Sequence, residues 1–194
     1  MTLFILFLVL VGCNAEQSMA YDVNSITKFR ADKNQAFIEE VWSPIPVEER
    51  IGFKGLNYFP VSPAWAVPAR YIPETHVDTV QMTTSKDELR TALRIGKFVF
   101  IIQGTEYTLW SFKFLEPVAG EVFFIPFKDA TCGTDAYELG RYVEVPVSAS
   151  GQYVIDFNMA YNPYCAYNSN YSCPLVPFYN TLSVPVTAGE KAWH

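Results

Sequence analysis

The chain has 194 residues, of which 50% are hydrophobic and 18% are charged. This length and composition are sufficient for one globular domain with a full-sized core, and they exclude a disordered chain. The formal net charge is −6, and no basic run occurs anywhere in the sequence. Binding to nucleic acid is therefore not expected, because it depends on lysine and arginine side chains that displace counterions from phosphates.

The first thirteen residues, MTLFILFLVLVGC, have the pattern of a targeting segment. The apolar run over residues 3–11 is too short to span a bilayer, which takes about 17 residues or more, but it matches the core of a signal peptide. The tetrapeptide LVGC that ends at Cys13 resembles the bacterial lipobox, although no lysine or arginine precedes it. We therefore expect a lipoprotein signal peptide over residues 1–12, lipid on Cys13 and a tether over residues 13–22. A buried first strand is the alternative.

An amphipathic helix is expected next. Apolar side chains spaced three to four residues apart follow Asn24 and Ser25, which are good helix caps. The helix should end near Trp42 because Pro44 follows it. A second short helical turn is expected from Pro46, where two glutamates follow.

From Gly55 onward, short apolar and β-branched runs alternate with turn residues. The runs cover residues 56–59, 64–71, 76–83, 89–94, 97–103, 107–114, 121–127, 141–147, 153–157 and 181–187. Close spacing without helical patterns predicts an all-β fold, either an antiparallel β-sandwich or a partly open barrel, covered on one side by the N-terminal amphipathic helix. Gly96 interrupts the apolar pattern between residues 89 and 103 and indicates a β-bulge. Residues 23–194 are expected to form a single β-rich domain.

Two long irregular segments, residues 126–142 and 156–180, interrupt the strand pattern. These segments, with GLNYFP at 55–60 and AGEK at 188–191, make the sequence similar to the family called domain of unknown function 1684. Many bacterial members of that family are predicted lipoproteins. The sequence departs from the family pattern at Cys132, where serine is usual, and at 176–177, where Val-Pro replaces a double proline. The resemblance implies a fold and an envelope location, and no activity, because the family has none established.

Three cysteines remain after Cys13, and two of them lie in the second segment. In an oxidising compartment we expect a disulfide between Cys165 and Cys173, because closing a loop of about eight residues removes roughly 2–3 kcal/mol of unfolded-state entropy. Free buried thiols and a metal site are the alternatives. The C-x7-C spacing is not a zinc signature and no histidine lies nearby, so we expect neither a metal nor another cofactor.

Several enzyme classes lack their motifs. The sequence has two histidines and contains no G-x-S-x-G, H-E-x-x-H, Walker or G-x-G-x-x-G motif. Serine hydrolase, metalloprotease, nucleotide-dependent and nicotinamide-dependent activities are therefore not expected. His76 lies in a strand-like run, where a histidine is usually a surface or core residue.

Carboxylates, amides, tyrosines and one arginine gather in or beside the two irregular segments. The candidate catalytic acids are Asp129, Asp156 and Glu190. The candidate ligand-binding residues are Arg141, Asn158, Asn162, Tyr137, Tyr161, Tyr167 and Asn180. Two acids about 5 to 10 Å apart can hydrolyse a glycosidic bond, and tyrosine rings offer flat faces to sugars. The alternative is that the arginine and the acids form buried ion pairs that only hold the loops to the sheet.

The sequence thus predicts a membrane-anchored lipoprotein of the bacterial cell envelope, facing the periplasm or the surface. We expect a ligand-binding or assembly module with a polar site at one rim of the sheet. The expected partners are the membrane, through the lipid, and a glycan or another envelope component. A carbohydrate-active hydrolase with paired carboxylates and a purely structural scaffold are the two alternative functions.

Overall fold

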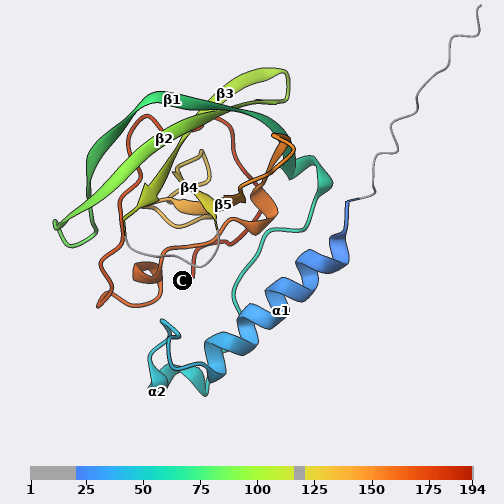
Figure 1. Cartoon of the computed structure of the whole chain (residues 1–194). Helices are drawn as coiled ribbons and strands as arrows, with labels where there is room; N and C mark the ends of the chain where they lie inside the picture. The colour runs from blue at the N-terminus through green and yellow to red at the C-terminus, as the bar shows by residue number, and fades with distance from the viewer. Residues whose placement is uncertain (1–20, 116–120, 194) are drawn as a thin grey trace, which may run out of the picture.

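The fold is a six-stranded antiparallel sheet that curls into a nearly closed barrel (Figure 1). The computed structural model describes residues 21–115 and 121–193. The strands are β1 (Ala66–Thr83), β2 (Leu89–Ile102), β3 (Thr105–Phe114), β4 (Val122–Phe127), β5 (Arg141–Pro146) and β6 (Tyr153–Asp156), in the sheet order β5-β4-β3-β2-β1-β6. The all-β prediction is confirmed, in its barrel form. The signal peptide, Cys13 and most of the tether lie outside the described residues.

The two longest strands, β1 and β2, each join two runs that the sequence separated. Pairing between β2 and β3 shifts by one residue between Arg94 and Gly96, so the bulge expected at Gly96 is confirmed. A β-carbon at this glycine would lie 2.6 Å from the carbonyl oxygen of Ile72 and would also meet the Tyr71 ring. The bulge bends the long β1–β2 hairpin so that it follows the curve of the barrel. A regular ladder of this length would be less strongly bent.

Two of the expected strands do not form. Residues 56–59 make a single bridge, between Tyr58 and Glu190, and residues 181–187 run as an extended segment whose side chains are alternately exposed and buried. This extended segment is held by individual bonds: the Leu182 amide donates to the Lys128 carbonyl oxygen at 2.8 Å. The alternation in the sequence therefore predicted correctly which side chains are buried. Among the described residues, however, the backbone of this segment makes only an isolated bridge, between Thr181 and Lys128, and no continuous ladder.

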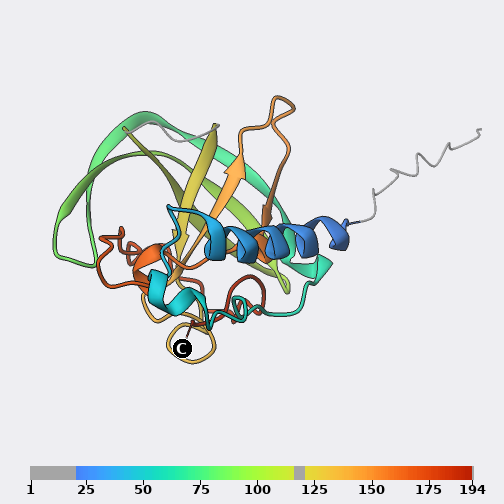
Figure 2. The ribbon, with the colours of Figure 1, turned by 90° about the horizontal axis from the view of Figure 1, so that it is seen from below.

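Helix α1 (Val23–Glu39) lies outside the barrel, across the side that carries the irregular C-terminal segments (Figure 2). It begins slightly earlier than expected, because the Asp22 carboxylate accepts the Asn24 and Ser25 amides at 3.0 and 3.2 Å. It ends three residues before Trp42. The short helix α2 (Val47–Arg50) confirms the predicted second turn. In the described ranges no helix is long and apolar enough to cross a membrane.

Hydrophobic side chains fill the barrel and a smaller space beneath α1. The main core contains, among others, Phe98, Phe100, Leu109, Ile125, Phe127, Val143, Ile155 and Phe157. A second cluster, made of Phe37, Ile45, Leu56 and Tyr167, joins α1 to the body. The helix is therefore part of the folded domain and not a loose arm of the tether.

The seam between β3 and β4 is unusual, because the two strands share only the pair Phe112 and Phe124. Two residues further along, Pro126 has no backbone N–H to donate. The side chain of Asn180 takes its place: its oxygen accepts the Trp110 amide at 2.8 Å, and its nitrogen donates to the carbonyl oxygens of Trp110 and Pro126 at 2.9 and 2.8 Å. Asn180 is fully buried and acts as a substitute peptide group in the sheet. This is the role of one predicted ligand-binding residue.

Replacing Asn180 with leucine, which is similar in volume, should destabilise the protein by about 3 kcal/mol or more, because three buried backbone groups lose their partners. Urea unfolding followed by circular dichroism measures the change. Thr181→Ala, at the exposed neighbouring position, is the control and should change stability by less than about 0.5 kcal/mol. Equal effects of the two substitutions would show that the seam does not depend on the amide.

Candidate functional site

The Arg141 guanidinium is fully buried at the start of β5. It binds the Asp129 carboxylate at 2.8 Å and donates to the carbonyl oxygens of Val186, Ala188 and Glu190. The other oxygen of Asp129 accepts the Thr131 amide at 2.8 Å and the Val186 amide at 3.1 Å. Charge-assisted bonds of this kind compensate the cost of burying both ions. Arg141 and Asp129 thus fasten the C-terminal segment to the barrel.

Glu190 is also buried, at 1% exposure, and has three partners of its own. One oxygen binds the Lys33 ammonium of α1 at 2.6 Å. The other accepts the Asn162 amide at 2.8 Å and the Tyr167 hydroxyl. Burial, together with the charge of Glu190, raises the pKa of Tyr167, so the phenol keeps its proton and remains a donor. Glu190 is therefore the point where helix α1 and the second irregular segment meet the C-terminal segment.

Asp156 and Asn158 form a separate network at the end of β6. The Asp156 carboxylate accepts the Tyr21 hydroxyl at 2.6 Å and the Asn158 side-chain nitrogen at 2.9 Å. The Asn158 amide in turn pairs with both backbone groups of Ser62, at 2.8 and 2.9 Å. Asn162 donates to the Lys191 carbonyl oxygen at 2.8 Å. These side chains bind the protein itself.

The structure places the two irregular segments side by side. The backbone groups of Tyr142 and Tyr161 exchange two hydrogen bonds of 2.9 Å. The Tyr161 hydroxyl reaches across to the Glu144 carboxylate at 2.8 Å, and the Tyr137 hydroxyl lies 3.8 Å from the Cys165 sulfur. Of the predicted site residues, Asp129, Arg141, Glu190, Asn162 and Tyr167 thus share one buried network, and Asp156 with Asn158 forms another.

The three described cysteines are free thiols. Cys165 and Cys173 are in contact, since the Cys165 amide donates to the Cys173 sulfur at 3.1 Å. The hydrogen bond from the Cys173 thiol lowers the pKa of Cys165 to about 6, and the same bond raises the pKa of Cys173. Cys132 is half-buried beside Asp129, and burial raises its pKa. Within the described ranges no three histidine, cysteine or acidic side chains are grouped as a metal site.

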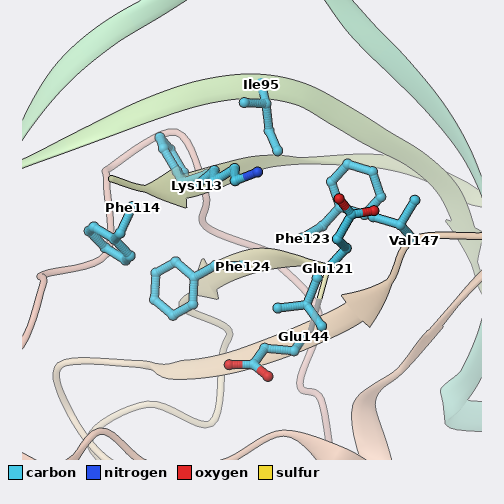
Figure 3. Close-up of a pocket in the computed structure, with 10 residues that line it drawn as sticks. Ile95, Lys113, Phe114, Glu121, Phe123, Phe124, Glu144 and Val147 are labelled. Carbon is cyan, nitrogen blue, oxygen red and sulfur yellow. The ribbon is translucent and has the colours of Figure 1, made fainter. Parts of the chain in front are cut away.

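A cavity of about 400 Å³ opens where β3 and β4 separate (Figure 3). It lies beyond the Phe112 and Phe124 pair, on the side of the seam that Asn180 does not close. Its walls are mostly apolar and come from β2, β3, β4 and the end of β5: Ile95, Phe112, Phe114, Val122, Phe123, Phe124 and Val147. The break in strand pairing therefore produces a hydrophobic hollow in the wall of the barrel.

Three charged side chains line the same cavity. Figure 3 shows Lys113 and Glu121 reaching in from the two sides of the seam, while the Glu144 carboxylate turns away from that of Glu121. All three are exposed to solvent, and Glu144 is held by Tyr161. None of them was predicted as a site residue, because each occupies an ordinary exposed strand position in the sequence.

A second, more open hollow of about 450 Å³ lies between α1 and the second irregular segment. Aromatic rings form most of its lining: Phe29, Phe37, Trp42, Tyr161 and Tyr164. Lys33 lines it as well, and its ammonium lies 5.1 Å from the centre of the Tyr161 ring. Tyr161, a predicted ligand-binding residue, therefore reaches an accessible surface, with its hydroxyl group bound to Glu144.

A family model and a solved structure both match most of this chain. Residues 51–191 match the model of a family described as "Protein of unknown function (DUF1684)". The chain belongs to this family. The solution NMR structure of an uncharacterised protein from gene locus rrnAC0354 of Haloarcula marismortui is 35% identical, with a TM-score of 0.68, over 87% of this chain and 92% of that one. No curated protein matches significantly.

In this DUF1684 protein, Asp129→Asn should destabilise the fold by about 3–5 kcal/mol, since it leaves Arg141 buried with its charge unpaired. Chemical unfolding measures the loss. Asp135→Asn is the matched control in the same segment, because its ion pair with Lys191, at 3.4 Å, is exposed, and it should cost less than about 0.5 kcal/mol. A stable Asp129→Asn variant would contradict the structural role of the pair.

Proposed function

We propose that this DUF1684 protein is a non-catalytic ligand-binding module of the bacterial cell envelope. Its ligand would be a small amphiphilic molecule with an apolar body and a neutral or positively charged head group. The observation that carries this proposal is the apolar cavity at the open end of the β3–β4 seam, with charged side chains at its mouth.

The size and lining of the cavity support a small molecule. Ligand sites in proteins usually have volumes of about 300–1,000 Å³, apolar walls and a few polar groups that orient the ligand. A cavity of about 400 Å³ fits this description at its lower end. Phe114 and Phe124, which are partly exposed, supply flat apolar faces to it. Burying an aliphatic or aromatic tail against them is favourable by about 0.8 kcal/mol per methylene.

The charges at the mouth favour a particular head group. Two carboxylates, of Glu121 and Glu144, and one ammonium, of Lys113, line this cavity. The local charge is therefore negative, as is the net charge of the whole chain. A cation entering this region is attracted and an anion is repelled, with an energy that solvent exposure keeps small.

The alternative functions have less support. A hydrolase needs two acids that face a substrate, but the candidate acids Asp129 and Glu190 are buried and bound by Arg141 and Lys33. Asp156 is bound by Tyr21 and Asn158. A purely structural scaffold accounts for these networks but not for an accessible apolar hollow with phenylalanine side chains at its surface. A glycan ligand is supported by the aromatic hollow beside α1 and is the second candidate.

The location rests on the sequence. The signal peptide over residues 1–12 would direct export. The lipid on Cys13 would anchor the chain, and residues 13–22 would connect the anchor to the cap of α1. In an oxidising envelope compartment the neighbouring thiols of Cys165 and Cys173 would join as the expected disulfide.

Binding can be tested by calorimetric titration with decyltrimethylammonium, with decanoate as the anionic comparison. We expect the wild-type protein to prefer the cation. Val147→Trp should weaken binding at least about tenfold by filling the cavity, a loss of about 1.4 kcal/mol. Val154→Trp is the matched control, because this valine on β6 is 48% exposed and Val147 is 47% exposed.

The double variant Glu121→Gln and Glu144→Gln should lose most of the preference for the cation, while the new amide at position 144 keeps an oxygen for the Tyr161 hydroxyl. A wild-type protein that binds neither probe, or equal weakening by the two tryptophan variants, would refute a ligand site in this cavity.

If lipid is attached to Cys13, Cys13→Ser should abolish labelling by an azido-palmitate precursor in expressing cells. The same substitution should move the protein from the membrane fraction to the soluble fraction. Cys132→Ser is the control and should keep both label and location. Retention of the label by Cys13→Ser would exclude lipid on this cysteine, without bearing on the cavity.

A further inference from the structure

The pair of thiols in the second irregular segment is asymmetric. Cys173 is buried, at 8% exposure, whereas Cys165 is half-buried in the short 3-10 helix Tyr164–Ala166. Tyr137 and Ala166, which flank Cys165, line a surface cavity of about 280 Å³. Cys165 is therefore the more exposed residue of the pair.

The Tyr137 hydroxyl lies 3.8 Å from the Cys165 sulfur and can donate to it. The Cys165 amide donates to the Cys173 sulfur at 3.1 Å, which holds the two cysteines in contact. Burial and the neighbouring Cys165 raise the pKa of Tyr137, so this phenol keeps its proton. Donors directed at one sulfur stabilise its thiolate, which is the reactive form of cysteine. The lowered pKa of Cys165 is consistent with this geometry.

Segments distant in sequence hold the two thiols in contact. The Ser85 amide, in the turn between β1 and β2, donates to the Cys173 carbonyl oxygen at 2.8 Å, and the Cys173 amide donates to the Ser85 hydroxyl at 3.2 Å. The Lys86 ammonium binds the Asn170 carbonyl oxygen at 2.9 Å. The turn thus fixes the position of the buried thiol beside Cys165.

We propose that Cys165 and Cys173 form a redox-active dithiol that exchanges with external disulfides, with Cys165 as the attacking thiol and Cys173 as the resolving thiol. This role goes beyond that of a structural disulfide, and it is independent of the ligand cavity. In the first step the Cys165 thiolate attacks one sulfur of a disulfide R–S–S–R, which forms a mixed disulfide and releases one thiolate. Cys173 then gives up its proton and attacks the Cys165 sulfur, which releases the second thiolate. The dithiol is oxidised and one external disulfide is reduced to two thiols.

The test uses the full chain in glutathione buffers, with acid quenching, alkylation and mass spectrometry. We expect a Cys165–Cys173 disulfide that forms and breaks reversibly as the ratio of oxidised to reduced glutathione changes. Cys173→Ser should accumulate glutathione on Cys165, because no resolving thiol remains. Cys165→Ser should leave Cys173 largely unmodified, and Cys132→Ser should behave as the wild type.

The pH dependence of cysteine alkylation distinguishes a reactive Cys165 thiolate from two thiols that are only close together. In wild-type protein the alkylation rate of Cys165 should have a midpoint near pH 6, and at pH 7 its exchange with oxidised glutathione should be at least about fivefold faster than that of Cys132. Tyr137→Phe should move the midpoint to higher pH, since it removes a donor while keeping the ring. A midpoint above about pH 8 in the wild type, close to that of an ordinary cysteine, or a glutathione adduct on Cys173 in preference to Cys165, would overturn the proposal.

Discussion

The fold depends on one buried charge. Arg141 carries a full positive charge with no solvent contact, and one carboxylate and three carbonyl oxygens compensate it. All of these partners lie in segments without regular secondary structure, so the guanidinium organises the parts of the chain that strand pairing does not. The lysine of α1 adds a second buried ion pair at Glu190, which joins the helix to the same C-terminal segment. Removing either ion would leave its partner charged and desolvated.

The polar residues in the two irregular segments therefore have a structural role in the fold. Their oxygens and nitrogens satisfy the backbone of loops that would otherwise be buried without partners, as Asn180 does for Trp110 and Pro126. The accessible space arises elsewhere, where β3 and β4 stop pairing and apolar side chains are left facing a hollow. The polar residues of the two irregular segments thus form hydrogen bonds within the protein. The cavity is lined instead by residues whose sequence pattern is that of ordinary strands.

Sequence reasoning predicted the barrel strands, the bulge at Gly96 and both helices because each depends on local periodicity or on one residue's conformational freedom. It could not locate the cavity, which results from the loss of pairing between β3 and β4 beyond Phe112 and Phe124. Sequence reasoning also could not distinguish an acidic residue that forms a buried ion pair from one that binds a ligand, because the two are the same residue types. One signal was available: Lys33 interrupts the apolar repeat of α1, and an ionic side chain at such a position indicates a buried partner.

The position of Arg141's partners has a consequence for biogenesis. The carbonyl oxygens that surround the guanidinium belong to residues 186–190, and the amide that repairs the seam belongs to residue 180. A polypeptide that is being synthesised therefore lacks the groups that complete its interior until residues 180–190 have been added. Under the export proposed above, the chain would complete this interior only after these residues have passed through the secretion channel.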